Sequence, residues 1–167
     1  MSKLGILVPS LGASQMGYYL CKNINDFVGS NPTSDIVCYY ENFEQECINP
    51  NFTCLHMAEA WMQKGTMIAT TESTAEKLIG FPGADNKYFY VWDLEWLRWE
   101  APKVRFGNLG YSPYLPYLNP SLEIICRSKN HAEIIENNFN REVKYIVEDF
   151  KIEQLMEVIH EKQHSNI

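Results

Sequence analysis

The 167-residue chain has no apolar run approaching the ~20 residues that a membrane-spanning helix needs. It also has no basic patch or stripe of the kind that nucleic-acid-binding proteins usually carry, since its formal net charge is −7 and its cationic residues are scattered. The apolar part of Met1–Pro9 is too short for a secretory signal. These absences predict a cytoplasmic protein with neither a membrane nor a nucleic acid as its partner.

Cysteine pairing is missing as well. The chain has five cysteines, an odd number, and no C-x-x-C motif. Cys38 and Cys126 lie within apolar segments that are typical of buried strands. We therefore expect reduced, mostly buried thiols, as in a cytosolic protein. A structural zinc site needs Cys and His at paired short spacings, so no metal ion is predicted.

Several nucleotide-binding and catalytic motifs are also absent. The turn after the first predicted strand contains G-A-S-Q-M-G, which is neither G-x-G-x-x-G nor a phosphate loop that ends in G-K-[ST]. Binding of NAD, or of ATP or GTP through a standard loop, is therefore disfavoured. No nucleophile elbow, H-E-x-x-H motif or EF-hand loop occurs. No catalytic residue and no cofactor is assigned from a motif.

What the sequence does contain is a regular alternation of apolar segments with helical ones. Because the segments are apolar throughout, rather than at every second position, both faces of their sheet are expected to be covered. This pattern predicts a single domain over residues 1–167 with a three-layer Rossmann-like α/β fold and a mainly parallel sheet of about six or seven strands. The strands assigned to that sheet are Leu4–Val8, Ile36–Tyr40, Met67–Ala69, Tyr88–Trp92, Ile124–Cys126 and Val143–Ile146.

Helices are expected between these strands. The first is predicted to end near Phe27, before a Gly-Ser-Asn-Pro break, and a helical turn is predicted at Asp93–Trp99. The segment Ala101–Tyr117 carries three Pro and two Gly and is expected to be largely irregular. The other predicted elements are a strand at Phe52–His56 and helices at Met57–Gln63, Ser73–Ile79, Asn130–Phe139 and Lys151–Lys162.

Polar residues follow several of the predicted strands, where a ligand site is expected. In an open parallel sheet, ligands bind at the carboxyl ends of the strands. The segments around Gly12, Asp93 and Arg127 should therefore converge on one edge of the sheet. The candidate ligand-binding residues at these strand ends are Gly12, Ala13, Ser14, His56, Thr70, Asp93, Glu95, Arg127 and Ser128.

Each group of candidates also has a purely structural interpretation. Gly12 allows close backbone approach, and the N–H groups of the following helix can meet an anion or a sugar hydroxyl, but a plain strand-to-helix turn explains the same residues. Asp93 and Glu95 lie in a tryptophan-rich segment that suits a polar ligand with an apolar face, although Asp93 as a helix cap accounts for that pattern too.

The remaining candidates have the same two interpretations. Thr70 belongs to a Thr-Thr-Glu-Ser cluster that offers hydroxyls to a ligand or caps a helix. Arg127 can reach a phosphate, or lie at the surface beside Ser128 at the start of a helix. His56 can serve as a general base, or be a partly buried side chain without a chemical role.

Two stretches carry a family resemblance. The first is the opening strand with its glycine turn and helix. The second runs from Gly65 to Phe150 and contains GTMIATTEST…KYFYVWDLEWL and IICRSKNHAEIIENNFNREVKYIVEDF. They resemble the N-terminal, acceptor-side domain of retaining GT-B glycosyltransferases. In that family the last strand leads into an Ile-Pro-Asn-Gly-type hinge, whereas Ile146–Phe150 here has neither Pro nor Gly.

The resemblance implies a ligand that contains a sugar or a nucleotide, such as a nucleotide-sugar, with Gly12 near its phosphates. In the family, the second domain makes most of the donor contacts, and here a single helix follows the resembling stretch. We therefore expect a partner chain to supply the second domain. We also expect the isolated chain to transfer no sugar, which leaves open whether it is an enzyme.

Two other hypotheses stay open. A non-catalytic protein-interaction module of the same fold would use the Tyr- and Pro-rich segment Lys103–Pro120 as its contact surface. A flavodoxin-like domain is compatible with the length, acidity and aromatic loops of the chain. However, a flavin phosphate loop needs several hydroxyls, and Ser10–Gly17 offers only Ser10 and Ser14. Purified protein without colour would dismiss the flavodoxin-like hypothesis.

Overall fold

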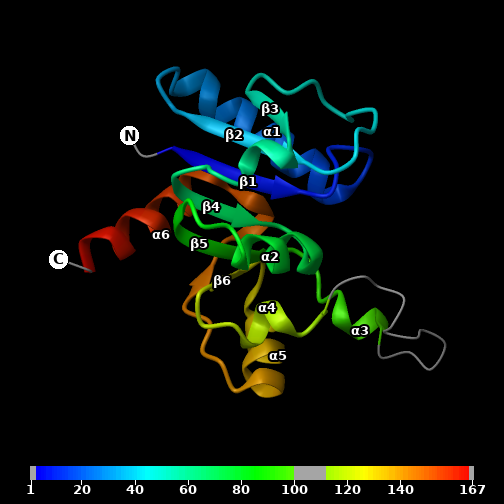
Figure 1. Cartoon of the computed structure of the whole chain (residues 1–167), viewed down its shortest axis with the longest axis vertical. Coiled ribbons are helices and arrows are strands. Elements are labelled where there is room, and N and C mark those ends of the chain that lie inside the picture. Colours follow the sequence, from blue (N-terminus) through cyan, green and yellow to red (C-terminus); the bar gives the residue numbers. More distant parts are fainter. Residues whose placement is uncertain (1–2, 100–111, 166–167) are drawn as a thin grey trace.

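The structure, a computed structural model, describes residues 3–99 and 112–165. Within these residues, seven strands form one sheet in the order β3-β2-β1-β4-β5-β6-β7 (Figure 1). Every neighbouring pair of strands is parallel. The strands are β1 (Leu4–Val8), β2 (Ile36–Tyr40), β3 (Thr53–His56), β4 (Gly65–Ala69), β5 (Ala84–Val91), β6 (Glu123–Cys126) and β7 (Tyr145–Ile146).

Helices cover both faces of this sheet. From β1 the chain moves outward to β3, then returns to the centre and moves the other way from β4. Because parallel crossovers are almost always right-handed, this reversal places the helices that follow β1 and β4 on opposite faces. One face carries α1 (Gln15–Ser30) and α6 (Ile152–Ser165). The other carries η1 (Met57–Ala60), α2 (Glu72–Ile79), α4 (Leu115–Leu118) and α5 (Lys129–Phe139).

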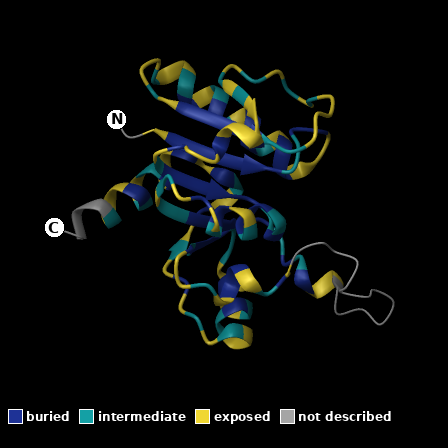
Figure 2. Ribbon diagram, viewed as in Figure 1, coloured by how far each residue is buried: buried dark blue, intermediate teal, exposed yellow. Residues whose placement is uncertain are grey.

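The two faces have separate hydrophobic cores, and single strands contribute to both. Ile6 and Val8 of β1 pack in the core beneath α1, while Leu7 between them packs in the core beneath α2. Figure 2 shows the central strands buried and exposed residues on the outer surfaces of the helices. Two covered faces explain continuous buried runs such as Leu4–Val8 in β1 and Tyr88–Val91 in β5, and the predicted three-layer α/β fold is confirmed.

The main differences from the prediction lie at the ends of elements. Trp92 lies just after β5 rather than within it, and β7 is shorter than the predicted Val143–Ile146. The η1 segment is a single 3₁₀ turn, so the helix predicted at Met57–Gln63 is too long. Part of the segment predicted to be irregular forms α4, where Pro116 lies in the first turn, a position that proline tolerates because the N–H it lacks has no helical partner there.

The cysteine prediction is confirmed for both strand positions. Cys38 and Cys126 are free thiols with 0% of their surface exposed. Cys21 on α1 is buried as well, whereas Cys47 in the loop after β2 is exposed.

No helix in the described ranges is long and apolar enough to cross a membrane.

Candidate functional site

A cleft lies at the carboxyl edge of the sheet, where the chain reverses its direction between β1 and β4. Open α/β sheets bind their ligands at such a switch point. The cleft has a volume of about 390 Å³ and is called the switch-point cleft below. Its lining residues come from three segments, each made of the loop and the first helical turn that follow β1, β4 or β5: Pro9, Ser10, Ser14, Gln15, Met16, Thr70, Thr71, Trp92, Asp93, Glu95 and Arg98.

The loop after β1 is folded tightly against the first turn of α1. The Ser14 side chain caps this helix by accepting a hydrogen bond from the Gly17 N–H at 2.9 Å. A Cβ on Gly17 would lie only 2.7 Å from the Gly12 carbonyl oxygen, so the close packing of helix against loop requires glycine there. Ser14 thus has a structural role as well as a place in the cleft.

Gly12 allows a close approach, but the group that approaches it is a side chain of this protein. A Cβ on Gly12 would overlap the Glu44 carboxylate, which also accepts a hydrogen bond from the Ser10 hydroxyl at 2.9 Å. Gly12 and Ala13 are not among the described residues that line the cleft. A carboxylate at this position disfavours a phosphate, the group that the family resemblance implies here.

At the end of β4, the hydroxyls serve mainly to hold the backbone. The Thr70 hydroxyl donates to the Leu7 carbonyl at 2.8 Å and so ties the ends of β1 and β4 together. Thr71 caps α2 by accepting from the Thr74 N–H at 3.2 Å, and the Thr74 side chain in turn accepts from the Thr71 N–H. The capping interpretation therefore describes this cluster, while Thr70 and Thr71 still line the cleft.

The segment after β5 differs from the prediction that Asp93 caps a helix. Asp93 forms an ion pair with Arg98 and accepts from the adjacent Leu94 N–H at 3.0 Å. The N–H of Trp96, the first residue of α3 (Trp96–Trp99), donates instead to Glu72 at 2.7 Å. The Asp93 side chain therefore remains partly exposed at the cleft, where a ligand can reach its carboxylate.

Glu72 is a buried carboxyl beside the cleft. It was not among the predicted site residues, and the only signal for it in the sequence is its place in the Thr-Thr-Glu-Ser cluster. Its side chain is 0% exposed, and one oxygen accepts from the Trp96 N–H and, at 3.1 Å, from the Tyr117 hydroxyl. Among the described residues, its other oxygen has no hydrogen-bond partner. Burial, followed by the charge of nearby Glu95, raises the pKa of Glu72 to about 8. Glu72 is thus mostly protonated at neutral pH.

Aromatic rings hold this corner of the site in place. Trp96 packs edge-on against Tyr117 with ring centroids 4.6 Å apart, and Tyr117 stacks on Phe139 of α5 at 4.7 Å. Both Trp96 and Tyr117 are almost fully buried. These contacts fix the N–H and hydroxyl donors around Glu72, and with them the wall of the cleft that carries Glu95.

Arg127 packs against Trp92, one of the residues that line the cleft. Its guanidinium lies 4.2 Å from the centroid of the Trp92 ring and forms an ion pair with Asp149 at 3.5 Å. The Ser128 hydroxyl caps α5 by accepting from the His131 N–H at 3.3 Å. Arg127 and Ser128 therefore follow β6 as expected, but their polar groups are engaged with neighbouring residues rather than lining the cleft.

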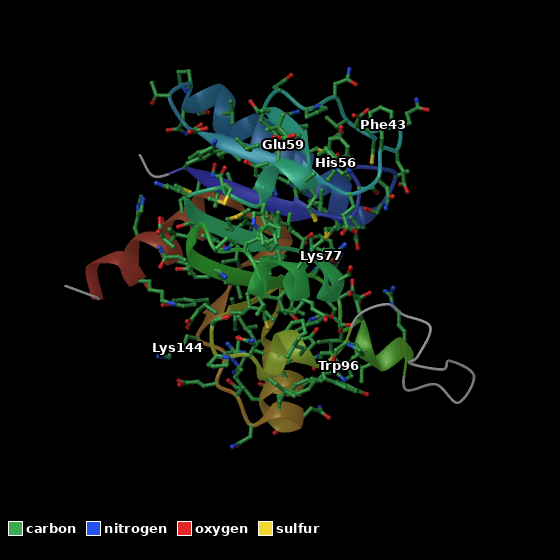
Figure 3. All side chains as sticks on the ribbon, in the orientation of Figure 1. Phe43, His56, Glu59, Lys77, Trp96 and Lys144 are labelled. Atoms are coloured by element: carbon green, nitrogen blue, oxygen red, sulfur yellow. The ribbon has the colours of Figure 1, made fainter. Side chains whose placement is uncertain are left out.

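His56 lies at a different hollow, which is called the His56 pocket. This pocket has a volume of about 580 Å³ and lies beside the carboxyl ends of β2 and β3, against α2. His56 and Lys77 of α2 are labelled in Figure 3. The described residues that line the pocket are Glu41, Asn42, His56, Met57, Ala58, Trp61, Lys77 and Phe81.

The structure thus gathers part of the predicted set. Ser14, Thr70, Asp93 and Glu95 line one cleft, whereas Gly12, Ala13, Arg127 and Ser128 are not among its described lining residues and His56 lines the other pocket. Across residues 3–99 and 112–165, no group of His, Cys, Asp and Glu is arranged to hold a metal ion.

The chain gives no significant match to a protein-family model, to a curated protein or to a solved structure.

Proposed function

We propose that this chain is a glycosyltransferase-like domain that binds a sugar- or nucleotide-containing ligand in the switch-point cleft. The observation that carries the proposal is the position of the cleft, at the strand-order reversal between β1 and β4. Free, buried cysteines fit a reducing compartment such as the cytoplasm.

The charges around the cleft favour the sugar part of such a ligand. Asp93 is paired with Arg98, which leaves Glu95 and the nearby Glu44 without a described cationic partner. Carboxylates accept hydrogen bonds from hydroxyls but repel phosphate oxygens. Trp92 also lines the cleft, although only 8% of its surface is exposed. We therefore place sugar hydroxyls, rather than phosphates, against the Asp93–Glu95 wall.

Thermal shift and calorimetry with UDP-, GDP- and ADP-sugars and with the corresponding free sugars test this proposal. A ligand present at 100 times its dissociation constant should stabilise the folded chain by ~2.7 kcal/mol. Asp93→Asn removes an exposed charge at the cleft and should weaken binding several-fold. Asp26→Asn removes a similar exposed charge from the Lys22–Asp26 pair on α1, away from the cleft, and should leave binding unchanged.

Two outcomes would contradict the proposal. One is the absence of stabilisation by every compound of the panel, and the other is equal binding by the Asp93→Asn protein and the wild type.

The Glu44 carboxylate beside Gly12 also opposes a flavodoxin-like domain, because a flavin phosphate in this loop would meet it.

A protein-interaction module is the alternative function, and one observation favours it. Leu118 on α4 is 61% exposed and Leu115 is 36% exposed, both within the proposed contact segment Lys103–Pro120. Tyr117 of the same segment is buried in the core, and residues 103–111 lie outside the described residues. Failure of every small-molecule ligand, together with a partner whose binding depends on Leu118, would favour this alternative.

A further inference from the structure

The His56 pocket has the features of a second small-molecule site. We propose that it binds a nucleoside, with the base stacked on Trp61 and the ribose hydroxyls bonded to Glu41. The pocket volume of about 580 Å³ lies within the range of ligand pockets in proteins, roughly 300–1,000 Å³. This site goes beyond the proposed function, because none of its lining residues belongs to the switch-point cleft.

Trp61 supplies the stacking surface. Its side chain is 52% exposed although it lines a pocket, so much of the indole is available to a ligand. Phe81 packs edge-on against it, with ring centroids 5.4 Å apart, and is itself only 5% exposed. The indole is thus held by a buried neighbour, which suits stacking of a flat base.

Glu41 is placed to meet ribose hydroxyls. It directly follows β2, and in nucleotide-binding sheets of this strand order an acidic residue near the end of the second strand accepts bonds from the ribose. Glu41 forms an ion pair with Lys77 across the pocket, so the two charges cancel. A neutral ligand that both donates and accepts hydrogen bonds suits such a pair.

His56 and Asn42 complete the polar lining. The Ala58 N–H donates to Nδ1 of His56 at 3.2 Å, so the neutral imidazole carries its proton on Nε2 and offers a donor. The Asn42 amide both donates and accepts. This set matches the mixed donors and acceptors of a base edge and a ribose, and it contains no surplus of positive charge for a phosphate.

The pocket and the cleft share a wall, which makes separate tests necessary. The backbone N–H of Asn42, in the pocket, donates to the carbonyl of Pro9, in the cleft, at 2.9 Å. Glu44 lies on the loop that follows Asn42 and contacts Ser10. The loop after β1, where a phosphate would be held, thus faces the Glu44 carboxylate, which is why we propose a nucleoside rather than a nucleotide.

Calorimetry and ligand-detected NMR with adenosine, guanosine, cytidine and uridine test the proposal on the intact chain. At least one of these nucleosides should bind the wild type, and its 2′-deoxy counterpart should bind more weakly. Trp61→Ala should weaken binding about fivefold or more, since loss of base stacking costs ~1–3 kcal/mol per base. Glu41→Gln should reduce the difference between the ribonucleoside and its 2′-deoxy counterpart.

Two control variants separate this site from others. Tyr18→Ala removes an exposed aromatic ring from α1, outside the pocket, and should leave nucleoside binding unchanged. Asp93→Asn alters the cleft and should likewise have no effect, so failure of the cleft proposal would not affect this one. The proposal is overturned if no nucleoside binds, if Trp61→Ala binds as well as wild type, or if free monosaccharides bind as tightly as nucleosides.

Discussion

Glu72 and Glu95 hold the starts of two helices together. The Glu72 N–H, at the start of α2, donates to the Glu95 carboxylate at 2.9 Å. In return, the Glu72 carboxyl accepts from the N–H of Trp96, the residue after Glu95, at 2.7 Å. One wall of the switch-point cleft therefore depends on two neighbouring acidic side chains, of which the buried one is mostly protonated at neutral pH.

The first prediction concerns pH. The pKa of Glu72 is raised from 4.5 to about 8 by burial and by Glu95, so between these pH values the folded chain retains a proton that the unfolded chain loses. The contribution of Glu72 to stability is complete below about pH 4.5 and is lost as the pH rises to about 8. The Glu72→Gln side chain stays uncharged, so between about pH 4.5 and pH 8 the variant should lose less free energy of unfolding than the wild type, by on the order of 3 kcal/mol.

Urea unfolding at about pH 5 and about pH 8.5 measures this difference. Glu59→Gln removes an exposed carboxylate on η1 and serves as the control, which should follow the pH dependence of the wild type. An identical pH dependence for Glu72→Gln and wild type would show that the Glu72 carboxyl is not buried as the structure has it.

The second prediction compares two glycines of α1. Gly17→Ala would place a methyl group 2.7 Å from the Gly12 carbonyl oxygen, and the resulting strain should destabilise the chain by about 1–3 kcal/mol. Gly29→Ala meets nothing within 4 Å and should stabilise the helix by up to ~1 kcal/mol, because alanine has the higher helix propensity. Thermal unfolding of both variants checks these opposite signs. Equal effects would mean that the loop after β1 does not pack against α1.

The third prediction concerns thiol reactivity. Burial raises the pKa of Cys126 to about 12 and that of Cys38 well above its usual value, so neither forms a reactive thiolate near neutral pH. Labelling of the native protein with a maleimide or with a disulfide reagent should modify the exposed Cys47 first and leave Cys38 and Cys126 unmodified. Rapid modification of both strand cysteines in the native protein would contradict the strand assignment.

The sequence by itself determined the fold class. Segments such as Leu4–Val8 are apolar at every position, and only a strand that is covered on both faces requires this. It also predicted the starts of α2 and α5 to within one residue, because capping is local: Thr71 and Ser128 accept hydrogen bonds from N–H groups three residues along the chain. Ser14, Thr70, Asp93 and Glu95 could be assigned to one edge because the carboxyl ends of parallel strands share an edge.

Only the tertiary structure decided which side chains meet. Glu44 covers Gly12, and Glu72 lies against Trp96 and Tyr117, through contacts between segments that are far apart in the sequence. His56 is the last residue of the edge strand β3, where η1 and α2 contribute to a separate pocket. A residue pattern reflects local periodicity and burial, whereas the partners of a polar side chain depend on how loops from different strands pack together. The packing of these loops raises the pKa of Glu72 and leaves the Asp93 carboxylate accessible from the cleft.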